Sequence, residues 1–119
     1  MTRISIVTAA AAAIFLLGIA TLSAHHGWGS YDAAKPITIE GPITQSNYQN
    51  PHATIRLKAP EKEWTVTLAP VTRMSARGAT QDKVAVGKTI SAFGYPSKVQ
   101  PDEMRAEWIK ADGETYQMR

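Results

Sequence analysis

Three histidines are the side chains in this sequence whose type and spacing best suit metal chemistry: His25, His26 and His52. Neutral imidazole nitrogens favour copper, followed by zinc or nickel. The first two histidines follow Ala24, a small residue at which a leader could be removed. Removal there would give His25 a free α-amine with a pKa of about 8, which loses its proton to a metal readily near neutral pH.

This amine and Nδ1 of His25 can close a chelate ring on one metal ion. A further imidazole would complete a T-shaped set of three nitrogens, and we favour His52 for it because alternation places His52 on the polar face of its strand. His26 is predicted only as an auxiliary ligand. Adjacent side chains of an extended arm point to opposite sides, so His25 and His26 could bind the same metal only if the backbone were bent. The competing interpretation is a solvated terminus and a histidine that only hydrogen-bonds in a turn.

Residues 1–24 have the features of a cleavable secretory signal. Arg3 gives a positive start, residues 9–20 are apolar, and small residues precede the cut. Cleavage would produce an exported chain that begins with the histidine pair. The alternative is an uncleaved membrane anchor, because residues 4–24 carry no charge and are just long enough to span a bilayer. The short apolar stretch favours cleavage.

The mature chain is predicted to consist of an irregular arm, residues 25–36, and one β-rich domain, residues 37–119. Alternation of apolar residues predicts five strands, at residues 37–48 with an interruption at Gly41-Pro42, 52–58, 64–68, 89–95 and 104–111. Between the third and fourth strands, residues 70–78 begin with Pro and end with Gly, which predicts one short helix. Asp112-Gly113 after the last strand is a turn signal.

This order of elements predicts the fold class: all-β with one short helix, in a small five-stranded barrel of the oligonucleotide/oligosaccharide-binding type. Closing the sheet would remove its exposed edges. A small open β-sandwich is the alternative. Trp64 and Trp108 are expected to face the core. Phe93 and Tyr95 share the face opposite to Ile90 and Ala92, where they form a small exposed patch or, if the strand has the other phase, fill the barrel.

Composition and missing motifs exclude several function classes. There are no cysteines, which removes disulfides, thiolate metal sites and a Cys nucleophile. The formal charge of +3 comes from scattered basic residues, so a nucleic-acid partner is not expected. The phosphate-binding and hydrolase motifs are missing. Carboxylates in predicted loops, at Glu61, Glu63, Asp102 and Glu103, are interpreted as solvated charges. We therefore do not expect an enzyme.

Several short motifs, in this order, resemble a family of small bacterial periplasmic proteins, the domain of unknown function 6152. They are Ala24-His25-His26, Tyr31-Asp32-x-x-Lys35-Pro36, Gly41 in its strand, Asn50-Pro51-His52, Trp64, Arg77-Gly78, Val86-Gly87-Lys88 and Phe93-Gly94-Tyr95. The resemblance covers essentially the whole mature chain and implies export and a barrel of the type above. It implies no known activity. Gly27-Trp28 and Thr67 depart from the residues that are usual in the family.

These observations predict a periplasmic, non-catalytic binding protein that holds copper through His25 and His52, with His26 as an auxiliary. The alternative is an envelope module without metal that binds a protein, peptide or glycan. Its binding face would be the barrel surface around Tyr48, Arg56, Phe93 and Tyr95. The membrane is expected as a partner only during export, or through an uncleaved N-terminal anchor.

Overall fold

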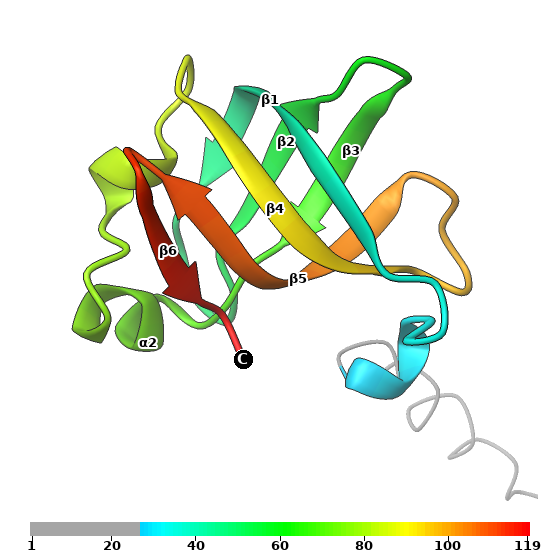
Figure 1. Ribbon diagram of the computed structural model, residues 1–119. Helices are drawn as coiled ribbons and strands as arrows, with labels where there is room; N and C mark the ends of the chain where they lie inside the picture. Colours follow the sequence, from blue (N-terminus) through cyan, green and yellow to red (C-terminus); the bar gives the residue numbers. More distant parts are fainter. Residues whose placement is uncertain (1–26) are drawn as a thin grey trace, which may run out of the picture.

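The computed structural model describes residues 27–119; the predicted leader and the histidine pair lie outside this part of the chain (Figure 1). In chain order its elements are the 3-10 turn η1 (Trp28–Ser30), the strands β1 (Ile37–Asn47), β2 (Thr54–Lys58) and β3 (Glu63–Thr67), the helix α2 (Val71–Ala76), the 3-10 turn η2 (Gln81–Val84), and the strands β4 (Thr89–Pro96), β5 (Glu103–Ala111) and β6 (Glu114–Gln117). Within residues 27–119, no helix has the length and apolar character needed to cross a bilayer.

The strands close into a barrel because β3 and β5 meet. Neighbours in the sheet order β3-β2-β1-β4-β5-β6 are antiparallel, and β3 additionally pairs with β5 in parallel. This pairing joins the two ends of a five-stranded sheet, while β6 extends the sheet beyond β5 (Figure 1). The predicted all-β barrel with one short helix is therefore confirmed.

Strand β1 serves both halves of the barrel because it continues through Gly41 and Pro42, where an interruption was predicted. Residues 37–42 pair with β4, and the segment from Ile43 onward pairs with β2. At Gly41 the backbone lies so close to β2 that a Cβ would overlap the carbonyl oxygen of Lys58. Glycine is therefore needed for close approach of two strands rather than to end one.

The core fills the barrel with aliphatic and methionine side chains. The largest fully buried ones are Ile43, Ile55, Leu57, Val66, Leu68, Met74, Val84, Met104, Ile109 and Met118. Helix α2 adds Met74 to this core. It begins after Pro70 and is followed by Gly78 at φ +89°, the left-handed geometry that ends many helices. Trp64 packs, half-buried, against the core, in line with its predicted inward position.

The prediction that Trp108 faces the core is wrong. The inward alternation of β5 holds up to Ala106, but the next fully buried inward residue is Ile109. A register shift against β4 between Phe93 and Gly94 inserts one extra residue into β5, and a bulge of this kind exchanges the two faces of a strand. Trp108 therefore stacks on Phe93 outside the barrel, with 5.4 Å between ring centroids.

The strand β6 was not predicted, although the turn before it was. Asp112 and Gly113 have φ values of 52° and 82°, and two successive positive values are typical of the tightest β-hairpin turns. The four residues of β6 include one buried side chain, Tyr116. So short a strand gives too little alternation to be recognised from the sequence alone.

Candidate functional site

One pocket lies where the β1–β2 loop (residues 48–53) meets the β4–β5 loop (residues 97–102). This loop pocket measures about 460 Å³, and its lining includes Tyr31, His52, Thr67, Glu103 and Arg105. The parallel pairing of β3 with β5 sets Thr67 beside Arg105, and Glu103 lies two residues earlier on the same face. Barrels of this type bind ligands with this face and these two loops.

Two hydroxyl groups hold the Glu103 side chain in the loop pocket. The Tyr31 hydroxyl donates a hydrogen bond to Oε2 of Glu103 at 2.6 Å, and the Thr67 hydroxyl donates to the same oxygen at 3.4 Å. Burial, together with the hydrogen bond to Glu103, raises the pKa of Tyr31 to about 12. The phenol therefore keeps its proton at neutral pH and remains a donor.

Arg105 is a nearly buried cation, 7% exposed, that aromatic rings cover. Its guanidinium carbon lies 4.2 Å from the centroid of the Trp28 ring and 6.0 Å from that of Tyr31. The guanidinium of Arg119 also lies over Trp28, at 4.5 Å. Loss of hydration lowers the pKa of Arg105. The electron-rich ring faces offset part of that lost hydration.

The described part of the arm is fastened to the barrel beside the loop pocket. The backbone N–H of Asp32 donates to the carbonyl of Pro96 at 2.8 Å, and that of Lys98 donates to the carbonyl of Ser30 at 2.9 Å. Together with the Trp28 contacts, these bonds fix the arm to the end of β4 and to the loop that follows. The arm, predicted to be irregular, therefore has defined partners.

Of the three predicted metal ligands, His52 lies within the described residues. It is half-buried, lines the loop pocket and follows a cis Asn50–Pro51 peptide bond just before β2. His25 and His26 lie outside the described residues. Within residues 27–119, no three His, Cys, Asp or Glu side chains are grouped closely enough to hold a metal. The three-histidine site stays a prediction.

The roles of Glu103 and Arg105 in this pocket were not predicted from the sequence. Glu103 was assigned to a solvated loop, because its partner Tyr31 lies 72 residues away in the chain. One feature of the sequence could have indicated that Glu103 and Arg105 act together. Glu103 and Arg105 alternate with the apolar residues Met104 and Ala106 at the start of a strand, which places both charges on one outward face.

The four residues of the alternative interaction face have different partners. Tyr48 packs against the core, and its hydroxyl donates to the carbonyl of Ala79 at 2.8 Å. Phe93 and Tyr95 face away from the core, which is the first of the two predicted arrangements, with 5.9 Å between their ring centroids. Arg56 extends over the outer face of β2. The face is thus divided between a core contact, an aromatic pair and a polar network.

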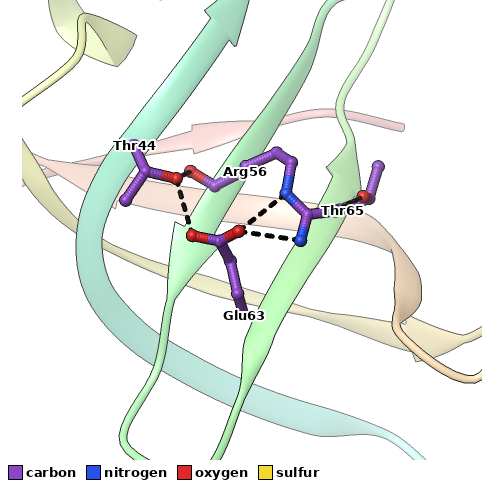
Figure 2. Close-up of polar contacts among 4 residues, drawn as sticks. All are labelled: Thr44, Arg56, Glu63 and Thr65. Carbon is purple, nitrogen blue, oxygen red and sulfur yellow. Dashed lines mark hydrogen bonds and ion pairs between the residues drawn. The ribbon is translucent and has the colours of Figure 1, made fainter.

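That network ties Arg56 to three side chains of neighbouring strands (Figure 2). Nε and Nη2 of Arg56 donate to Oε2 of Glu63 at 2.9 and 2.8 Å, and Nη1 donates to the hydroxyl of Thr65 at 2.6 Å. The Thr44 hydroxyl donates to Oε1 of Glu63 at 2.9 Å. A second pocket of about 410 Å³ lies along this network and shares lining residues with the loop pocket.

The network predicts a pH-dependent contribution of Glu63 to stability. Hydrogen bonds from Arg56, and then from Thr44, lower the pKa of Glu63. A carboxyl whose pKa is lower in the folded chain stabilises the fold above its unfolded pKa of about 4.3, and this contribution is lost as the pH falls through the folded value. We expect Glu63→Gln to lower the free energy of unfolding slightly at about pH 6 and above, with a difference from the unmodified chain that narrows below about pH 4.

Urea unfolding of both chains across this pH range measures the difference. Glu61→Gln is the matched control, because Glu61 lies in the neighbouring β2–β3 turn and has no hydrogen-bond or ion-pair partner within residues 27–119. A deficit of Glu63→Gln that stays constant from neutral to acid pH would contradict the prediction.

Comparison with solved structures finds similar barrels inside longer chains. One is the crystal structure of the ZRD-deleted mutant of TiaS in complex with agmatine, with a TM-score of 0.53, 14% identity, and coverage of 73% of this chain and 27% of that chain. Another is the crystal structure of TiaS in complex with an isoleucine tRNA and ATP, with a TM-score of 0.50, 13% identity, and coverage of 68% and 19%. This chain thus spans about a quarter or less of those proteins, and the likeness is one of fold alone.

No curated protein sequence matches the chain. A family model matches residues 13–104, which is most of the chain, and it describes a family of unknown function, DUF6152. The matched region includes motifs that now have a structural place, such as the close approach at Gly41 and the loop-pocket residue His52. The chain belongs to DUF6152, a family of unknown function.

Proposed function

We propose that this protein is exported to the periplasm and binds, without catalysing a reaction, one copper ion in the loop pocket. The ligands are the α-amine and Nδ1 of His25 and the imidazole of His52, with His26 as an auxiliary. The observation that carries the proposal is the position of His52, which lines a pocket beside the point where the arm is fastened.

The fastened arm supports the proposal because it limits how far His25 can be from His52. Trp28 lies against Arg105, and Arg105 lines the same pocket as His52. From Trp28 back to His25 is three residue steps, and an extended chain covers about 10 Å in three steps. That reach is enough to cross a pocket of about 460 Å³.

The chemistry of the donors selects the metal. A site of nitrogen ligands binds Cu(II) more tightly than it binds other divalent ions of the first transition series. An α-amine with a pKa of about 8 loses its proton readily when a metal binds near neutral pH. The amine exists only after the leader is removed at Ala24, so the proposal ties metal binding to export.

Copper titration of the mature chain, with its N-terminus verified by intact mass, tests the proposal. Three further proteins are needed: the His52→Ala variant, a mature chain whose His25 α-amine is acetylated and so cannot bind a metal, and a Glu63→Gln control outside the loop pocket. We expect one copper ion per chain, with affinity reduced by about 10–100-fold or more in the first two and unchanged in the control.

A peptide of residues 25–30 sets the reference for a terminus without a barrel. Binding by the mature chain that is no tighter than this peptide would overturn the proposal and direct attention to the metal-free alternative. Equal affinities of the unmodified chain and His52→Ala would also overturn it, because the barrel would then contribute no ligand.

A further inference from the structure

The carboxylate of Glu103 enters the loop pocket with one oxygen held and the other available. Oε2 accepts the hydrogen bonds from Tyr31 and Thr67. Within the described part of the chain, Oε1 accepts no hydrogen bond and forms no ion pair. The two hydroxyls restrict the side chain to one orientation, so its second oxygen is placed for a ligand without a further loss of side-chain entropy.

The charges around the loop pocket favour a role for this carboxylate. Glu103 is the one acidic residue among the described residues that line the pocket, and Arg105 is a cation in the same lining. A divalent metal held by neutral nitrogens alone would add two positive charges beside Arg105, in surroundings where burial strengthens electrostatic interactions. The Glu103 carboxylate offsets part of this charge.

We infer that Glu103 supplies an oxygen ligand to the metal, so that the loop pocket offers three nitrogens and one oxygen and selects Cu(II) over Cu(I). This inference rests on the proposed function. Tetragonal sets of nitrogen and oxygen ligands suit Cu(II), whereas Cu(I) prefers the sulfur of Cys and Met. The described lining of the pocket contains no sulfur.

Tyr31 is then a positioning residue that acts through Glu103. Its hydroxyl donates a hydrogen bond to Oε2 of Glu103 at 2.6 Å and so fixes the orientation of the carboxylate. Without the Tyr31 hydroxyl, the carboxylate keeps the weaker hydrogen bond from Thr67 and gains freedom to rotate.

The test compares Cu(II) and Cu(I) binding by the mature chain that begins at His25. The variants are Glu103→Gln, which removes the charge but keeps the shape, and Tyr31→Phe, with Glu63→Gln as the control carboxylate outside the pocket. Cu(II) affinity is measured by competition with a chelator and by electron paramagnetic resonance, and Cu(I) affinity by anaerobic competition with a chromophoric chelator. Circular dichroism confirms that each variant is folded.

We expect Glu103→Gln to weaken Cu(II) binding by at least about tenfold, to alter the copper hyperfine splitting, and to change Cu(I) affinity by less than about twofold. Tyr31→Phe should lower Cu(II) affinity by a smaller factor and broaden the spectrum, since the carboxylate remains. If Glu103→Gln does not fold, Glu103→Asp replaces it. Aspartate keeps the charge but is one methylene shorter, so its carboxylate no longer lies where Tyr31 and Thr67 hold that of Glu103, and a similar loss of Cu(II) affinity is expected.

Two results would overturn the inference and leave the proposed function standing. In the first, Glu103→Gln has the same Cu(II) affinity and the same electron paramagnetic resonance spectrum as the unmodified chain, while His52→Ala no longer binds Cu(II). In the second, Glu103→Gln weakens the binding of Cu(II) and of Cu(I) by the same factor, which would show that Glu103 does not make the pocket prefer Cu(II). By contrast, an unmodified mature chain that binds Cu(II) no better than the peptide of residues 25–30 would overturn the proposed function and the inference together.

Discussion

Replacing Gly94 by alanine is expected to lower the free energy of unfolding by about 3 kcal/mol or more. A Cβ at this position would overlap the carbonyl oxygen of Arg105 and crowd the Cα of Ala106. Both atoms belong to the backbone of β5, so relief requires the two strands to separate at the bulge. Urea unfolding, followed by tryptophan fluorescence, measures the change.

Gly29→Ala is the control for this prediction, because a Cβ at Gly29 meets no atom within 4 Å. Its stability should stay within about 0.5 kcal/mol of the unmodified chain. A Gly94→Ala variant as stable as Gly29→Ala would show that β4 and β5 can move apart freely. The pairing of β4 with β5, which places Arg105 against Trp28, would then not be rigid.

Trp28→Ala is expected to release the arm and to destabilise the protein by about 2 kcal/mol. The indole contacts two guanidinium groups and, edge to face, the rings of Tyr31 and Tyr95. Interactions of these kinds contribute about 0.5–1.5 kcal/mol each, and their sum is reduced because Trp28 is only half-buried. Thermal and urea unfolding measure the loss of stability.

The same variant links the arm to the proposed metal site. If Trp28 holds the mature N-terminus near His52, Trp28→Ala should also weaken Cu(II) binding by about tenfold, because the released arm loses part of its effective concentration at the pocket. Val99→Ala is the control in the adjacent loop, because Val99 is 58% exposed. It should change neither the stability of the protein nor its Cu(II) affinity. Unchanged Cu(II) affinity in Trp28→Ala would mean that the arm need not be docked for binding.

Local patterns in the sequence predicted most of the fold. Alternation located the five barrel strands, and Pro70 with Gly78 located the helix, since these signals depend only on neighbouring residues. The orientation of Trp108 could not be predicted, because it depends on a bulge that arises from the pairing of β4 with β5. A bulge that arises from pairing with another strand cannot be recognised from the spacing of apolar residues within one strand.

The candidate site was less predictable for the same reason. His52 was identified from its residue type and its position beside a strand, and it does line a pocket. For Glu103 the sequence predicts a solvated charge, because neither Tyr31 nor Thr67 is near it in the chain. The partners of a pocket residue depend on how the barrel closes, which composition and periodicity do not reveal.

The short parallel pairing of β3 with β5 has a consequence for the order of folding. It joins Thr65 to Glu103 and Thr67 to Arg105 across the helix and β4, whereas most other pairings join strands that follow one another closely. Contacts between distant segments form late, because the loop between them must first be closed. The loop pocket straddles this seam, so a newly made chain has no pocket until its barrel has closed. If the pocket binds copper as proposed, only fully folded molecules can bind it.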